Sequence, residues 1–317
     1  MIHFAPGRAC LLGEHCDWAG GVDAACLVVP LKVGIEVTVR RADWGLVVHS
    51  AYGVTRMGAD MRCVAEDPNR YVAAVARELL RQGLSLPPAR VVVRSTLLAG
   101  RGFSSSAAVC VAAARALAAH AGVEVDAAGV AYRAERRDLG VNCGEMDQLA
   151  SAAGAPLFID WGPPRAERRL RPGLSIPLLV AAFPDEISAA PILAALAEAR
   201  PSAAFAAWGA GARRAAVALE AGDLVALGAE LDAAQAVYES LELPALQAPK
   251  LGETCDALRA LGALGAKFSG AGGDRSLVAV FEDDGGLARG RVLLEERGLI
   301  VLDASLAQSS STTPTSM

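Results

Sequence analysis

The chain has 317 residues, of which 53% are hydrophobic and 21% are charged, and its formal net charge at pH 7 is -5. This length exceeds the size of one typical core and predicts two domains, and the apolar content excludes a disordered protein. The acidic balance without a block of lysines and arginines argues against nucleic acid as a partner, and the absence of a run of about 20 uncharged apolar residues argues against a membrane span.

The first residues and the cysteines indicate the compartment. The sequence MIHFAPGRACLLGEH lacks the basic region, apolar block and cleavage site of a secretory signal. The seven cysteines are odd in number and include no C-x-x-C pair, a pattern that fits reduced thiols better than a disulfide framework or a zinc site. We therefore expect a cytoplasmic protein, and the sequence leaves its oligomeric state open.

The first predicted element is an apolar segment, 3–12, that ends in a polar cluster. The cluster reads Gly13-Glu14-His15-Cys16-Asp17-Trp18 and is closed by Gly20-Gly21. It fits a solvated turn, but three ionisable side chains at the end of a strand also fit a pocket that hydrogen-bonds several hydroxyls. We favour the pocket.

Residues 33–40 alternate apolar and polar side chains with the period of a half-buried strand. Residues 46–49 are expected to pair with this strand through a turn at 41–45. A helix is predicted to begin at an Asp67-Pro68 cap and to end at Gly83. Its buried stripe consists of Tyr71, Val72, Val75 and Leu79.

A strand at 90–94 leads into a glycine-flexed, serine-rich turn and an alanine-rich helix, LAGRGFSSSAAVCVAAARALAAH, at 98–120. Glycines let a backbone approach an anion closely, and the free amides at a helix N-terminus bind it, so this turn fits a phosphate cradle. An ordinary serine cap before a core helix explains the same residues equally well. The turn alone does not decide between the two.

Two further polar features follow the serine-rich turn. A helix is predicted from an Asp126 cap to Gly140, with Glu135 in its last turns. The segment VNCGEMDQLASAAG then predicts a tight turn at Cys143-Gly144 and a short helix that presents Asp147 in its first turn. A carboxylate at that position is often only a partner of the helix dipole.

The second half predicts strands and alanine-rich helices. Strands are expected at 157–160, 176–183, 277–281 and 299–302, and helices at 203–219, 223–241, 253–261 and 287–297. A turn or interdomain crossing is expected at 162–164, and a glycine-rich turn at Gly270–Gly273 precedes the strand 277–281. Residues 308–317 have too few apolar groups to offset the entropy of ordering, and we expect a disordered tail.

Spacing excludes several familiar sites. The sequence has no G-x-x-x-x-G-K-[ST] phosphate loop, and Gly100-Arg101-Gly102 lacks the third glycine of a dinucleotide-binding loop. Ser104 is not in a G-x-S-x-G elbow because residue 106 is serine. Arg137-Asp138-Leu139 echoes a protein-kinase catalytic loop, but Cys143 stands where that loop requires asparagine.

Four motifs in sequence order resemble the GHMP kinase superfamily, and within it the galactokinases. APGRACLLGEHCDWAGG resembles the galactokinase signature PGRxNLIGEHTDYNGG, and GRGFSSSAA resembles the ATP-binding motif G-x-G-L-S-S-S-A. AERRDLGVNCGEMDQ resembles the galactokinase segment AExxxxGVNCGxMDQ, and KFSGAGGDRSLVAVF is similar to the carboxy-terminal glycine motif. Chance agreement over four ordered motifs is improbable.

The resemblance implies an α/β fold of the two-domain α+β kind. Residues 1–165 would form an ATP-binding domain like the second domain of ribosomal protein S5, and residues 166–307 a ferredoxin-like domain, with the active site between them. The implied reaction transfers the γ-phosphoryl group of ATP to a hydroxyl of a small-molecule substrate, with Mg²⁺ as cofactor. Most of the catalysis in such a reaction is positioning and charge stabilisation.

The resemblance also assigns site residues. Asp147 would be the catalytic aspartate, either as general base or as an electrostatic orienter, with Arg8 beside it favouring its ionised form. Ser106 and Glu135 are the candidate Mg²⁺ ligands. Nucleotide contacts are expected from Gly100, Gly102, Ser104, Ser105, Ser106 and Ala107. Substrate contacts are expected from Glu14, His15, Asp17, Gly144 and Gly272.

Some positions depart from the family motifs. They are Leu98 for proline, Phe103 for leucine, Trp18 for tyrosine, and a shortened third motif that introduces Asp274-Arg275. The resemblance to galactokinases implies a monosaccharide kinase acting at the anomeric hydroxyl. A mevalonate-type or other non-sugar GHMP kinase is the alternative, against which Asp17 speaks. A non-catalytic sugar and nucleotide sensor is a further alternative, which the retention of Arg8, Ser106 and Asp147 disfavours.

Overall fold

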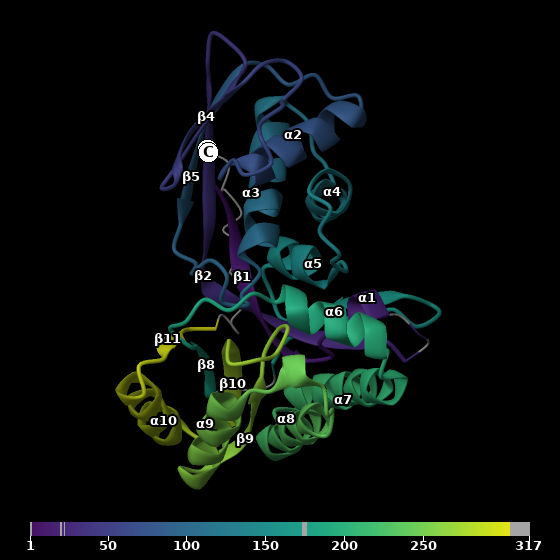
Figure 1. The fold of residues 1–317 in the computed structure, drawn as a ribbon, viewed down its shortest axis with the longest axis vertical. Coiled ribbons are helices and arrows are strands. Elements are labelled where there is room, and N and C mark those ends of the chain that lie inside the picture. Colours follow the sequence, from purple (N-terminus) through teal and green to yellow (C-terminus); the bar gives the residue numbers. More distant parts are fainter. Residues whose placement is uncertain (1, 20, 22, 173–175, 305–317) are drawn as a thin grey trace, which may run out of the picture.

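The residues that the structure describes form two β-sheets, each covered by helices (Figure 1). The structure, a computed structural model, describes residues 2–19, 21, 23–172 and 176–304. The expected tail at 308–317 lies outside these residues. The first sheet is built from the N-terminal half of the chain and the second from the C-terminal half, so the architecture is the expected two-domain mixture of α and β.

The first sheet is organised around one long strand, β2. Its strands are β1 (Ile2–Leu12), β2 (Ala25–Arg41), β3 (Leu46–Ser50), β4 (Gly53–Met57), β5 (Ala89–Ser95), β6 (Leu157–Asp160) and β7 (Ala166–Arg169). Strand β2 pairs antiparallel with β1, β5 and β6, and the sheet continues from β5 to β3 and β4. Residues 5–12 of β1 and 25–31 of β2 are buried because helices and the second domain cover them, whereas Ile2 and Phe4 at the start of β1 are exposed.

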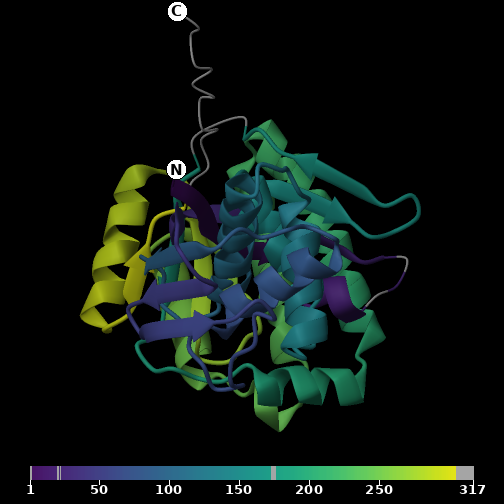
Figure 2. The ribbon, with the colours of Figure 1, turned by 90° about the horizontal axis from the view of Figure 1, so that it is seen from above.

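Helices from the first half pack around α3, on one side of the sheet (Figures 1 and 2). They are α2 (Arg70–Arg81), α3 (Ser105–His120) itself, α4 (Ala127–Arg133), a π-helical turn at Ala134–Asp138, and α5 (Met146–Ala153). The short helix α1 (Cys16–Ala19) instead contacts β2 and a helix of the second half. Helix α3 contacts β1, β2 and three neighbouring helices, and its small alanine side chains allow this close approach. The N-terminus of α3, with the serine-rich turn, is thereby fixed.

The second sheet confirms the ferredoxin-like topology. Its elements are β8 (Leu178–Ala182), α6 (Ala190–Ala199), α7 (Ser202–Ala221), α8 (Leu224–Glu239), a 3₁₀ turn at Pro244–Leu246, α9 (Pro249–Ala260), β9 (Ala263–Phe268), β10 (Ser276–Phe281), α10 (Asp284–Glu296) and β11 (Ile300–Leu302). The strand order β11-β8-β10-β9 places the first and third strands of this domain at the centre, all antiparallel. The glycine-rich turn lies between β9 and β10.

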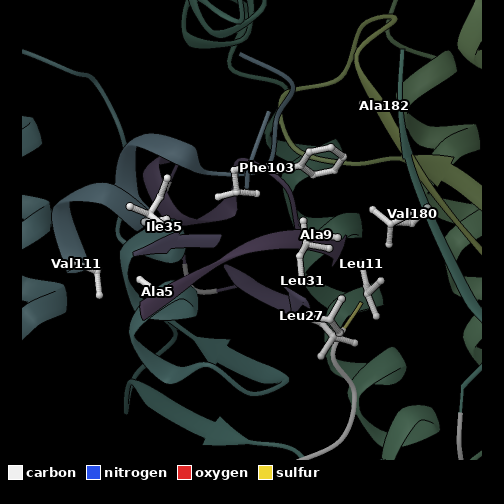
Figure 3. Close-up of a cluster of buried hydrophobic side chains, with 14 of the residues drawn as sticks. Ala5, Ala9, Leu11, Leu27, Leu31, Ile35, Phe103, Val111, Val180 and Ala182 are labelled. Atoms are coloured by element: carbon white, nitrogen blue, oxygen red, sulfur yellow. The ribbon is translucent and has the colours of Figure 1, made fainter. Parts of the chain in front are cut away.

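The two domains share one apolar core. Figure 3 shows Ala9 of β1 and Val180 of β8 in one cluster with Phe103, which belongs to the serine-rich turn. Phe103 is 1% exposed, so this turn is anchored in the core between the domains. Helix α7 packs against β1 and β2, and Leu31 forms a β-bridge with Ala304. The turns that the motifs singled out are therefore held against one another.

Several element predictions need correction. Residues 46–49 form a strand, but the pairing prediction is wrong: β3 pairs with β5 and β4, because β5 occupies the edge of β2. Helix α2 begins after Asn69, and Asp67 does not cap it. The Asp67 carboxylate instead accepts hydrogen bonds from Asn69 N (2.8 Å) in the turn before the helix and from Thr55 Oγ1 of β4 (2.6 Å). The Asp126 cap is confirmed, but the helix widens into the π-helical turn that carries Glu135. The elements that the sequence did not indicate are α1, β4, β7, α6, the 3₁₀ turn at Pro244–Leu246 and β9.

Candidate functional site

A buried arginine and a carboxylate 139 positions apart in sequence form the centre of the site. Arg8 Nε donates to Asp147 Oδ1 at 2.8 Å, Arg8 Nη2 lies 2.7 Å from the same oxygen, and Nη1 donates to the Gly102 carbonyl at 2.6 Å. Burial is the largest single effect on the pKa of Arg8 and lowers it, but the charge of Asp147, its hydrogen bond and the charges of Cys10 and Asp17 together outweigh burial, and the pKa is raised. Arg8 therefore joins the first turn of α5 to the serine-rich turn, and the Asp147 side chain remains 29% exposed.

Two cavities meet at the serine-rich turn. The larger, about 740 Å³, is lined by apolar side chains of β2, β5 and α3 and by Tyr52, and is called the Tyr52 cavity below. The smaller, about 340 Å³, contains Arg8 and Asp147 and is called the Asp147 cleft. The residues that line both are Tyr71, Gly100, Ser105, Ser106, Ala189 and Arg275.

The serine-rich turn has the geometry of an anion site. Gly100 and Gly102 have φ of 71° and 87°, and Ser104 has φ of 57°, a left-handed conformation that is uncommon for a non-glycine residue and often occurs at functional sites. Ser104 does not cap α3 through its side chain, and its buried Oγ has no hydrogen-bond partner among the described residues. The amides and hydroxyls at this helix N-terminus are thus available to a ligand.

The glycine-rich turn packs directly on the serine-rich turn. A Cβ at Gly270 would lie 3.0 Å from the Gly102 carbonyl oxygen, and one at Gly102 would lie 2.8 Å from Ser276 Oγ. Larger side chains at these two positions would push the turns apart. The close approach of the turns explains why both carry glycine.

His15 presents a hydrogen-bond donor to the Asp147 cleft. Burial lowers its pKa to about 4, so the imidazole is neutral at pH 7. Trp18 Nε1 donates to His15 Nδ1 at 3.3 Å, and an indole can only donate, so the proton of the ring is on Nε2. His15 Nε2 is buried and makes no hydrogen bond of good geometry to the described residues, although an interaction with the Ala271 backbone opposes the fall in the pKa of the ring. The ring lines the Asp147 cleft, where a ligand oxygen can accept a hydrogen bond from this N–H.

Asp17 and Gly144 form one structural unit in the same cleft. Asp17 Oδ2 accepts a hydrogen bond from Met146 N at 3.2 Å, and a Cβ at position 144 would lie 2.1 Å from that oxygen. Gly144 is therefore required for the close approach of Asp17. Burial, and then the charge of Asp147, raise the pKa of Asp17 to about 7.

The raised pKa of Asp17 predicts a pH effect on stability. Between about pH 4 and pH 7 the folded protein retains a proton that the unfolded chain has lost, so the free energy of unfolding falls as pH rises through this window and levels off above it. We expect the fall in the free energy of unfolding to be about 2 kcal/mol smaller in Asp17→Asn than in the wild type. This is less than the shift in the pKa of Asp17 alone would give, because the side chain is partly open to the cleft and solvent screens its charge. Urea denaturation of both proteins at pH 4.5, 6 and 8 measures it. Equal falls in the two proteins would contradict the effect.

Glu135 and Ser106 fit one side of a magnesium site. Burial raises the pKa of Glu135 to about 7, although hydrogen bonds from Gln148 and Ser106 act in the opposite direction. Mg²⁺ prefers carboxylate, hydroxyl, phosphate and water oxygens. Over the described ranges no three acidic, histidine or cysteine side chains converge, so such an ion would take its other ligands from phosphates and water.

Some predicted site residues do not line the Asp147 cleft. Glu14 is 1% exposed and forms an ion pair with Lys267 in the core. Gly272 faces away, since a Cβ there would lie 2.6 Å from the ring of Tyr238, and its neighbour Ala271 lines the cleft instead. Ala107 is buried in α3. The other predicted nucleotide and substrate residues line the Asp147 cleft, the Tyr52 cavity or both.

The structure also adds residues that the sequence did not single out for the site. They are Tyr52, Tyr71, Asn142, Cys143, Gln148 and Arg275. Tyr71 was expected in the buried stripe of α2, but it is half-buried and lies where the two cavities meet. Its position in a helical pattern could not distinguish a core side chain from a cavity wall.

Comparison with family models gives two matches. Residues 70–155 match the GHMP kinases N terminal domain, and residues 215–292 match the GHMP kinases C terminal model. The two matches together cover just over half of the chain. The two matches have the expected order in the sequence, and they fall in the domains that carry the first and the second sheet.

Relatives in sequence fall into two groups. Galactokinases from Thermotoga neapolitana and Chloroflexus aurantiacus are 33% and 34% identical over 165 and 169 residues, which is 49% of this chain and 45% and 42% of those proteins. The matched part thus spans less than half of the galactokinases. A mevalonate kinase from Aeropyrum pernix is 29% identical over 321 residues, which is 97% of this chain and 96% of that protein.

Solved structures show the same fold. Galactokinase from Lactococcus lactis complexed with galactose has a TM-score of 0.78 and 19% identity, covering 96% of this chain and 93% of that one. Phosphomevalonate kinase from Streptococcus pneumoniae in complex with phosphomevalonate and AMPPNP has a TM-score of 0.82 and 16% identity, covering 96% and 99%. None of the helices that the structure describes is long and apolar enough to cross a membrane.

Proposed function

Because the chain belongs to the GHMP kinases, a family of ATP-dependent phosphotransferases, we propose that it transfers the γ-phosphoryl group of ATP to a monosaccharide hydroxyl. We place the transfer at the anomeric hydroxyl, as in a galactokinase. The observation that carries the proposal is the Arg8 bridge, which ties an acid in the Asp147 cleft to the turn at which that cleft meets the Tyr52 cavity.

The Tyr52 cavity suits the donor nucleotide. Its walls include Ile35, Val93 and Val109 together with the ring of Tyr52, and such apolar and aromatic surfaces bind a nucleobase. The same cavity is lined by Ser105 and Ser106, the first two residues of α3, where amides and the helix dipole attract phosphate. ATP bound in this way would direct its terminal phosphate toward the Asp147 cleft.

Asp147 is placed to act on the acceptor hydroxyl. It lies in the first turn of α5 with one oxygen bound by Arg8, and the carboxylate faces the cleft. In the reaction we propose, the acceptor hydroxyl loses its proton to Asp147 while its oxygen attacks the γ-phosphorus, and the bond from that phosphorus to the β–γ bridging oxygen breaks so that ADP leaves. Ser106 and Glu135 would hold Mg²⁺, which supplies charge neutralisation at the phosphates when bound.

Polar groups in the cleft favour a sugar as acceptor. His15 offers an N–H donor, and Asp17 offers a carboxyl oxygen beside the 142–144 turn. A site that hydrogen-bonds hydroxyls rejects analogues that lack them, because its own buried groups are then left unpaired. The neutral His15 donor fits a hydroxyl, carbonyl or carboxylate oxygen and does not fit an ammonium group.

A non-sugar acceptor is the second candidate. The mevalonate kinase of Aeropyrum pernix matches almost the whole chain, whereas the galactokinases match about half of it. The polar lining contributed by His15 and Asp17 still favours the sugar. The seven cysteines are all free thiols, which leads us to propose that the reaction takes place in a reducing compartment, the cytoplasm.

A substrate screen tests the proposal. Purified protein with ATP and Mg²⁺ is assayed for coupled ADP release over aldohexoses, pentoses, uronic acids, amino sugars, mevalonate and phosphomevalonate. We expect release with at least one neutral sugar, none with sugars that place an ammonium group at His15, and loss of activity in Arg8→Met. Release with mevalonate or phosphomevalonate alone would refute the sugar assignment. Binding of sugar and nucleotide without any release would favour the sensor.

A further inference from the structure

Arg275, one of the two residues that the shortened glycine motif introduces, lies in the wall between the two cavities. It is 7% exposed and lines both the Tyr52 cavity and the Asp147 cleft. Its neighbour Asp274 has a structural task, since Asp274 Oδ1 accepts a hydrogen bond from Leu251 N at 2.8 Å near the start of α9. Asp274 thus binds the start of α9, whereas Arg275 lines the site.

The Arg275 guanidinium is short of partners. Nη2 donates to the Gly100 carbonyl at 3.1 Å, whereas Nε is buried and has no hydrogen-bond partner in the described part of the chain. No described carboxylate lies within ion-pair distance of it, although Asp17, Glu135 and Asp147 line the same cleft and Glu186 lines the Tyr52 cavity. Burial, and then the charge of Arg8, lower the pKa of Arg275. A buried cation without an anion is unfavourable and is stabilised when an anion binds beside it.

We propose that Arg275 binds the phosphoryl group that is being transferred, at the junction of the donor and acceptor cavities. This inference rests on the proposed function. A guanidinium presents a planar set of N–H donors that matches phosphoryl oxygens, and a cation at this point stabilises the charge that develops during transfer. The hydrogen bond from Arg275 to the Gly100 carbonyl holds the guanidinium beside the serine-rich turn, where the donor phosphates are expected.

The test compares two nucleotides that differ in the terminal phosphate. Isothermal titration measures the binding of ADP and of AMPPNP, both with Mg²⁺, to the wild type, Arg275→Met, Arg275→Lys and the control Arg62→Met. Arg62 is an exposed arginine whose ion pair is with Asp60, so its replacement removes the same charge away from both cavities. We expect Arg275→Met to bind AMPPNP at least ~10-fold more weakly and ADP within ~3-fold of the wild type. Arg275→Lys should fall between, because it keeps the charge but loses the planar donors.

Stability separates this role from a structural one. Because the unliganded site holds an uncompensated cation, unliganded Arg275→Met should have a Tm equal to or above that of the wild type, and tripolyphosphate should raise this Tm less than that of the wild type. Equal loss of ADP and AMPPNP binding, unchanged binding of both, or failure of both Arg275 variants to fold would overturn the inference. Wild-type protein that binds neither nucleotide would instead refute the proposed function.

Discussion

Asp147→Asn is expected to lower kcat by about 10³-fold, the size of a typical general-base contribution. The asparagine amide cannot take the proton of the acceptor hydroxyl. Its Oδ1 can still accept both hydrogen bonds from Arg8, so the Arg8 bridge and the start of α5 should be retained. The binding of nucleotide and sugar should therefore change little, and the loss should lie in kcat. Steady-state kinetics with the sugar found in the screen provide the measurement.

Glu145→Gln is the matched control for Asp147→Asn. Glu145 lies two positions earlier at the N-cap of α5, and its carboxylate pairs with Arg165 (2.6 Å) outside the cleft. We expect this variant to retain kcat within about threefold, since surface ion pairs contribute little. If Asp147→Asn folded normally and kept most of its turnover, the aspartate would be an orienting charge, and the base assignment would be refuted.

Lys267→Met is expected to destabilise the fold by about 3 to 5 kcal/mol, the usual result of leaving one charge of a buried ion pair without its partner. Lys267 is fully buried in β9, where its ammonium pairs with Glu14, donates to the Phe268 carbonyl and lies 4.1 Å from the centre of the Phe268 ring. Glu14 connects this strand to the turn that carries His15 and Asp17. Urea denaturation gives the free energy of unfolding.

A double variant isolates the ion pair from the loss of packing. Glu14→Gln combined with Lys267→Met removes both charges, and we expect it to recover at least about half of the stability that Lys267→Met loses. Such a result would indicate that Glu14, through its ion pair with Lys267, stabilises the segment that carries His15 and Asp17. A cost below about 1 kcal/mol for Lys267→Met, or additive losses in the double variant, would contradict a strongly coupled pair.

Local signals in the sequence predicted much of the fold. A serine-rich turn before an alanine-rich run, a cap at Asp126 and the alternation at 33–40 identified α3, α4 and part of β2, because these signals act over a few residues. The pairing of β3 with β5 was missed because β5 comes some forty residues later in the chain, and no local pattern reports a partner at that distance. The π-helical turn at Glu135 was missed for a similar reason, since its sequence reads as a continuous helix.

The site was predictable where a motif fixes chemistry and unpredictable where packing decides. Arg8, Asp147 and the serines come from motifs, and the structure brings them to two adjoining cavities. Glu14 belongs to the same motif as His15, but whether each side chain faces the cleft or the core depends on the turn between them and on Lys267. A lone lysine within the apolar run LGAKF was a usable signal, because a buried ammonium requires a carboxylate partner.

The most direct test is to identify the product of the reaction. The protein is incubated with ATP, Mg²⁺ and the monosaccharide that responds in the screen, and the mixture is followed by ³¹P NMR. We expect equal amounts of ADP and one sugar phosphate ester, with phosphorus coupled to the anomeric proton, and formation of both about 10³-fold more slowly with Asp147→Asn. If ATP remained unchanged with every monosaccharide, while mevalonate or phosphomevalonate gave a new phosphate ester, the proposed transfer to a sugar would be contradicted.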